Sequence, residues 1–113
     1  MTIEECYSIM GGDWEGIMRR LGNEELIAKL SLKFLSSKEY FDIGDAIRNH
    51  DWEKAFMCTH TLKGVAGNLG LTALYGALSA LTEPLRRGQT KDLVSLRQAV
   101  QAERESLVRL LNG

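Results

Sequence analysis

Five leucines spaced three or four residues apart constrain the fold more than any other feature of the sequence. This spacing keeps all five on one side of an α-helix: Leu71, Leu74, Leu78, Leu81 and Leu85. The chain has a single proline, Pro84, and no run in which β-branched residues alternate with polar ones. The sequence therefore predicts an all-α protein.

Capping residues divide the chain into segments. We expect short helices over residues 2–9 and 14–21, and longer helices over 23–34, 38–48, 52–69, 72–85 and 90–111. Asp13, Asn23 and Asp51 are good N-cap residues, and Gly22 and Gly70 are typical helix stops. Long amphipathic helices with short connections favour an antiparallel four-helix bundle with short extra N-terminal helices, formed by one domain over residues 1–113.

Three helix ends are less clearly marked. Ser36 and Glu39 offer a capping box for the helix over residues 38–48, although the segments on either side could also form one bent helix. Pro84 should kink or end its helix before Arg86. Thr90 is expected to start the last helix.

Charge and composition exclude several classes of function. The formal net charge of −1 provides no basic field for nucleic acid or for an anionic membrane. The apolar runs are too short to span a bilayer, and the acidic N-terminus is unlike a signal peptide, so we expect a cytoplasmic protein. The two cysteines and two histidines lack metal-ligand spacing, and we expect neither a metal nor a cofactor.

The segment His60–Gly70, HTLKGVAGNLG, holds three glycines in a predicted helix. Each interior glycine costs about 1 kcal/mol relative to alanine. At about 100° per residue, His60 lies opposite an expected apolar stripe and should face solvent. The stripe consists of Cys58, Leu62, Val65 and Leu69. Gly64 and Gly67 fall on the side of His60 and remove side chains beside it, whereas Gly70 needs only the role of a helix stop.

An exposed histidine with cleared surroundings suits nucleophilic attack on phosphorus. An exposed imidazole is mostly neutral at pH 7 and keeps a free nitrogen lone pair. Lys63, one turn away, can offset the negative charge of a phosphoryl group. Phe56, one turn before His60, is an apolar side chain for a partner to cover; with a slightly rotated helix it becomes a boundary core residue instead.

The segment Thr59–Gly70 resembles the signature of histidine-containing phosphotransfer (HPt) domains of bacterial phosphorelays, roughly H-x-L-K-G-x-A-x-x-L/I-G. The resemblance implies a four-helix bundle in which His60 takes a phosphoryl group from an aspartyl phosphate on a receiver domain and passes it to another receiver. It implies that Lys63 stabilises charge and that Gly64 provides clearance. Gly67 and Phe56 complete the expected docking surface.

The partners implied are receiver domains of a hybrid histidine kinase or a response regulator. We expect a monomeric phosphocarrier without autokinase activity. Some family members place a glutamine on the following helix near the phosphohistidine, and this chain has none between Thr72 and Gly88. Ser79, Thr82 or Glu83 would have to take its place.

Two other classes of function compete with this interpretation. The glycines of Gly64–Gly70 superficially resemble a nucleotide-binding loop, but such a loop should follow a strand and open a helix. A helical bundle that binds a partner without phosphate chemistry is the stronger alternative, with His60 incidental.

Overall fold

The chain folds into seven α-helices with no strand, and the computed structural model describes all 113 residues. The helices are α1 (Ile3–Met10), α2 (Trp14–Leu21), α3 (Glu24–Leu35), α4 (Glu39–Arg48), α5 (Trp52–Asn68), α6 (Thr72–Arg86) and α7 (Leu93–Asn112). The all-α prediction is confirmed. None of these helices has the length and apolar character needed to cross a membrane.

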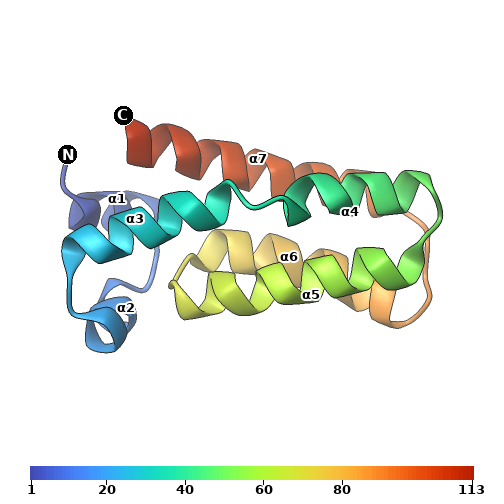
Figure 1. Cartoon of the computed structure of the whole chain (residues 1–113), viewed down its shortest axis with the longest axis horizontal. Helices are drawn as coiled ribbons and strands as arrows, with labels where there is room; N and C mark the ends of the chain where they lie inside the picture. Colours follow the sequence, from blue (N-terminus) through green and yellow to red (C-terminus); the bar gives the residue numbers. More distant parts are fainter.

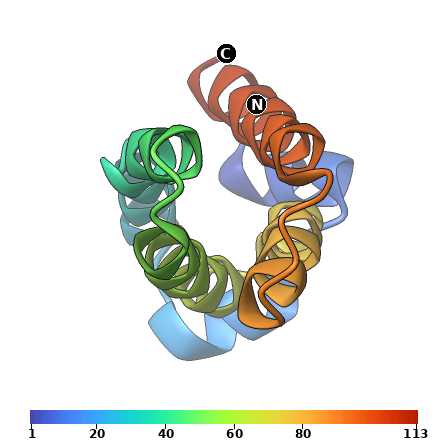
Figure 2. The same ribbon diagram turned by 90° about the vertical axis from the view of Figure 1, so that its right-hand side faces the viewer.

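The helices form four columns around one core. α3 and α4 lie end to end and make one column, and α5, α6 and α7 make the other three (Figure 1). Figure 2 shows these columns end-on, with the N-terminal helices behind them. α5 packs against both α4 and α6, and α6 packs against α7. The predicted antiparallel four-helix bundle with short extra N-terminal helices is therefore confirmed.

The predicted capping residues begin and end the helices as expected. The side chains of Asp13, Asn23 and Asp51 each accept a hydrogen bond from the backbone N–H three residues later. Gly22 and Gly70 have φ angles of +63° and +68°, in the left-handed region that a glycine adopts without strain. Local hydrogen bonding and backbone freedom thus set the limits of α2, α3 and α5.

The predicted capping box at Ser36 is wrong. The Ser36 hydroxyl donates instead to the carbonyl oxygen of Leu32, at 3.0 Å, and α4 begins at Glu39 without a side-chain cap. A turn separates α3 from α4, so the two are not one bent helix.

Two other helix limits differ from the sequence prediction. α6 continues through Pro84 and ends at Arg86, two residues after the proline. α7 begins at Leu93 and not at Thr90, because Asp92 has a φ of +64° that no right-handed helix accommodates.

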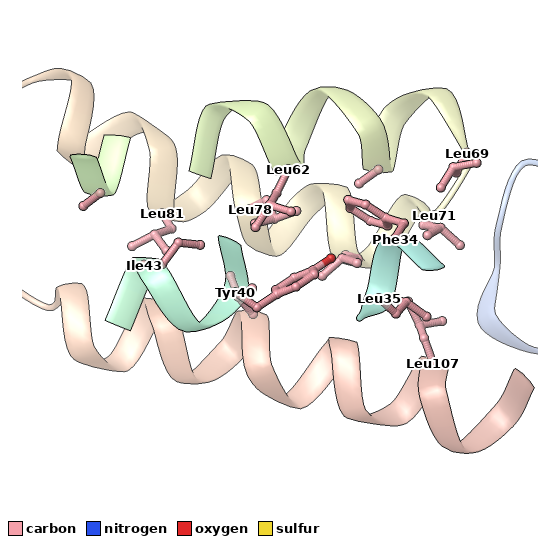
Figure 3. Close-up of a cluster of buried hydrophobic side chains, with 14 of the residues drawn as sticks. Phe34, Leu35, Tyr40, Ile43, Leu62, Leu69, Leu71, Leu78, Leu81 and Leu107 are labelled. Atoms are coloured by element: carbon pink, nitrogen blue, oxygen red, sulfur yellow. The ribbon is translucent and has the colours of Figure 1, made fainter. Parts of the chain in front are cut away.

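The core lies between the four columns and contains the whole leucine stripe of α6. Figure 3 shows Leu62 of α5 and Leu78 and Leu81 of α6 directed toward Ile43 and Tyr40 of α4. All five are 3% exposed or less. The apolar face predicted from the leucine spacing is therefore the face that α6 buries.

Two polar contacts attach the N-terminal helices to the end of α5. The buried Tyr7 hydroxyl of α1 donates to the carbonyl oxygen of Leu69 at 2.6 Å, and burial raises the pKa of this phenol. From α2, Arg20 donates through Nε and Nη2 to the carbonyl oxygen of Asn68, at 3.0 and 2.7 Å. Both contacts satisfy carbonyl groups that a helix C-terminus leaves unpaired.

Replacing a core leucine should destabilise the bundle strongly. Leu78 is fully buried, so Leu78→Ala should lower the free energy of unfolding by about 2–5 kcal/mol, as cavity-forming substitutions do. Val94 is 63% exposed, and Val94→Ala should change it by less than about 0.5 kcal/mol. Urea unfolding measures both values; equal losses would contradict this description of the core.

Candidate functional site

The orientation of α5 determines which side chains reach the surface. Its buried residues are small or medium in size: Ala55, Thr59, Leu62 and Ala66. Two members of the predicted stripe, Leu62 and Leu69, are buried, but Val65 is 37% exposed and Cys58 is half-buried. On a helical wheel at about 100° per residue, the buried residues centre about 60° around the axis of α5 from the predicted stripe.

Thr59 shows why a stripe predicted from apolar residues alone did not match the buried face of α5. Its hydroxyl donates to the carbonyl oxygen of Ala55 at 2.7 Å, which allows this polar residue to be fully buried. His60, the next residue, remains exposed as predicted.

The rotation turns Phe56 toward α6. Phe56 is half-buried against the core, as in the boundary position that the sequence left open. Its ring stacks on the His60 imidazole, with centroids 5.5 Å apart and an interplanar angle of 14°. From the end of α6, the guanidinium carbon of Arg86 lies 5.2 Å from the Phe56 centroid. His60 thus has an aromatic neighbour that an arginine contacts in turn.

Lys63 is half-buried and also lies on the α6 side of His60. Its Nζ is 5.8 Å from the centroid of the Tyr75 ring, within the range of a cation–π contact. No carboxylate forms an ion pair with it. The ammonium charge one turn from His60 is therefore not neutralised by an acidic side chain.

The two glycines beside His60 have different surroundings. A Cβ added to Gly64 would meet nothing within 4 Å, so the surface there is open. A Cβ added to Gly67 would lie 3.3 Å from Cδ2 and Cε2 of Tyr75. Gly64 fits the predicted clearance, whereas a side chain at Gly67 would crowd the ring of Tyr75.

The structure separates the three α6 residues considered for the glutamine position. Thr82 is fully buried and its hydroxyl donates to the carbonyl oxygen of Leu78 at 2.6 Å. Glu83 forms ion pairs with Arg86 and Arg87, at 3.4 and 3.9 Å. Ser79 is half-buried, and its Oγ has no hydrogen-bond partner. Of the three, only Ser79 has an uncommitted hydroxyl.

A shallow apolar groove borders the other side of the site. It has a volume of about 400 Å³ and runs between α3 and α5, where its lining includes Phe34, Thr61, Leu62, Val65 and Leu69. No group of three or more His, Cys, Asp or Glu side chains is placed to hold a metal ion.

Comparison with known families places the chain in one of them. The family model described as Hpt domain matches residues 24–111 of the 113-residue chain, a span that includes His60, Lys63 and Gly64. The chain belongs to the HPt family. HPt domains are phosphocarriers of two-component phosphorelays and interact with receiver domains. No curated protein and no solved structure matches the chain.

Sequence reasoning missed two neighbours of the HPt signature. Tyr75 is the one aromatic residue of α6, and this could have drawn attention to it as a neighbour of the site. The contact of Arg86 with Phe56 joins residues thirty positions apart in the chain. Such contacts depend on the relative orientation of α5 and α6, and this orientation cannot be predicted from the sequence of either helix alone.

Alanine substitutions should distinguish the two glycines of the HPt signature. Gly64→Ala should raise the free energy of unfolding by about 0.5–1 kcal/mol, because alanine is the better helix former and the space is open. Gly67→Ala should gain less, since the Tyr75 ring must move. Gly76→Ala, at an equally open helical position on α6, gives the reference value in urea unfolding. Equal gains at all three sites would show that Tyr75 does not restrict Gly67.

Proposed function

We propose that His60 is the phosphoacceptor of a receiver-to-receiver phosphorelay. The observation that carries this proposal is an exposed histidine on a helix, next to the open surface of Gly64, within the span matched to the HPt family. An imidazole nitrogen attacks the phosphorus of an aspartyl phosphate on the donor receiver. The N–P bond forms as the acyl phosphate P–O bond breaks, and the aspartate leaves as a carboxylate. Transfer to a second receiver reverses these steps.

Lys63 is the proposed charge-stabilising residue. Its ammonium group has no carboxylate partner and can turn from the Tyr75 ring toward a phosphoryl group on the imidazole. The phosphate comes from a protein partner, so the proposed carrier needs no autokinase activity. We further propose that it acts as a monomer in the cytoplasm.

The surface on the open side of His60 supports docking of a receiver. Gly64 leaves bare backbone, and the neighbouring Met57 and Val65 are 56% and 37% exposed. These side chains lead toward the groove between α3 and α5. Exposed apolar side chains beside a groove are typical of a surface that a partner covers. In this proposal Phe56 supports the imidazole from its half-buried side, Gly64 admits the partner, and Gly67 accommodates Tyr75.

Removing the proposed nucleophile should abolish phosphate acceptance. His60→Gln should receive no acid-labile label from a phosphorylated receiver domain, while its circular dichroism spectrum remains helical because His60 is exposed. His50→Gln is the matched control, since His50 is also exposed but stacks on Trp52 at 5.1 Å. A His60→Gln chain that is still labelled would rule out this assignment and favour a bundle that only binds partners.

Filling the open surface should slow transfer without unfolding the protein. Gly64→Glu should lower the transfer rate by about tenfold to a hundredfold, because a misplacement of about 1 Å at a reacting centre can cost that much. Its free energy of unfolding should rise slightly, since glutamate is the better helix former. Gly76→Glu adds the same charge on the exposed face of α6 and should leave the rate unchanged. An unaltered rate in Gly64→Glu would show that the open surface is not the path of approach.

A further inference from the structure

We propose that Arg86 is a positioning residue for His60, acting through the ring of Phe56. The inference rests on the proposed role of His60 as phosphoacceptor. Three contacts link the end of α6 to the imidazole. The Nε of Arg86 donates to Oε1 of Glu83 at 3.4 Å, the guanidinium lies 5.2 Å from the Phe56 centroid, and Phe56 stacks on His60 at 5.5 Å.

The space around Phe56 explains why a further contact is needed. One part of the side chain packs against the core. A hollow of about 310 Å³ lies beside it, lined by Trp52, Glu53, Phe56, Leu85 and Arg86. The ring therefore has room to move on that side, and the guanidinium that contacts it limits this movement.

The consequence for the reaction is orientational. An exposed histidine rotates about two side-chain torsions, and attack on phosphorus requires a ring nitrogen to point at the incoming group. A near-parallel stack on a fixed ring restricts these rotations. The ion pair between Arg86 and Glu83 orients the guanidinium, so α6 helps to set the plane of an imidazole on α5.

The neighbouring Arg87 provides a matched comparison. It lies next to Arg86, carries the same charge and contacts the same Glu83, at 3.9 Å. Its side chain is more exposed than that of Arg86, and it makes no aromatic contact. Replacing Arg87 therefore removes a charge from the same helix end without removing the contact with Phe56.

Single-turnover transfer from a phosphorylated receiver domain tests the proposal. Arg86→Gln should lower the maximal rate by about three- to tenfold, the range spanned by one aromatic stacking contact, and leave the half-saturating donor concentration unchanged. Arg87→Gln should remain within about twofold of the parent chain. Arg86→Lys keeps a cation near the ring and should recover part of the loss.

Two further measurements show whether the effect passes through Phe56 to His60. In a Phe56→Leu background, Arg86→Gln should cause no additional loss, because coupled residues are not additive. In the unphosphorylated protein, the imidazole NMR resonances of His60 should move in Arg86→Gln and stay in place in Arg87→Gln. Equal effects of the two glutamine variants, or a change only in the half-saturating concentration, would overturn the proposal.

The spectra also separate this proposal from the proposed function. If His60→Gln is still labelled, the phosphoacceptor assignment fails whatever Arg86 does. The resonances of His60 then decide by themselves whether Arg86 orients the imidazole. If His60→Gln is unlabelled and Arg86→Gln leaves both rate and resonances unchanged, only the positioning role fails.

Discussion

The packing of α5 against its neighbours through small side chains is the constraint on which the site depends. Ala55 and Ala66 are fully buried, and Thr59 is buried with its hydroxyl bonded to its own helix. This face turns His60 outward and brings Phe56 and Lys63 toward α6 at the same time. His60, the proposed nucleophile, can therefore be exposed while its neighbours are held by a second helix, an arrangement that suits a reactive side chain on a rigid element.

Much of the fold could be predicted because its signals are local. N-cap side chains and left-handed glycines set the limits of α2, α3 and α5, and the leucine spacing gave the buried face of α6. The rotation of α5 could not be obtained in the same way. Its buried face consists partly of alanine and threonine, whereas Val65, a stronger apolar signal, is exposed. Tyr75 and Arg86 were missed because their contacts cross between helices.

The glycines of the HPt signature illustrate how one pattern can have several physical causes. Gly64 leaves an open surface, Gly67 lies against an aromatic ring, and Gly70 adopts a left-handed conformation at the end of the helix. From the sequence, the first two looked like a single clearing around His60. The surroundings or the backbone conformation therefore differ at each of the three glycines, and a substitution at each should have a different effect on stability.

The contacts of Tyr7 and Arg20 with the end of α5 have a consequence for how the family signature is supported. Both residues lie before residue 24, outside the span shared with the HPt family, yet they bind the last carbonyl groups of the segment that carries His60. The helix that carries the HPt signature is thus held at its C-terminal end by two residues outside the family match. Substitutions in α1 and α2 can therefore change how tightly the end of α5 is held, without replacing any residue of the signature.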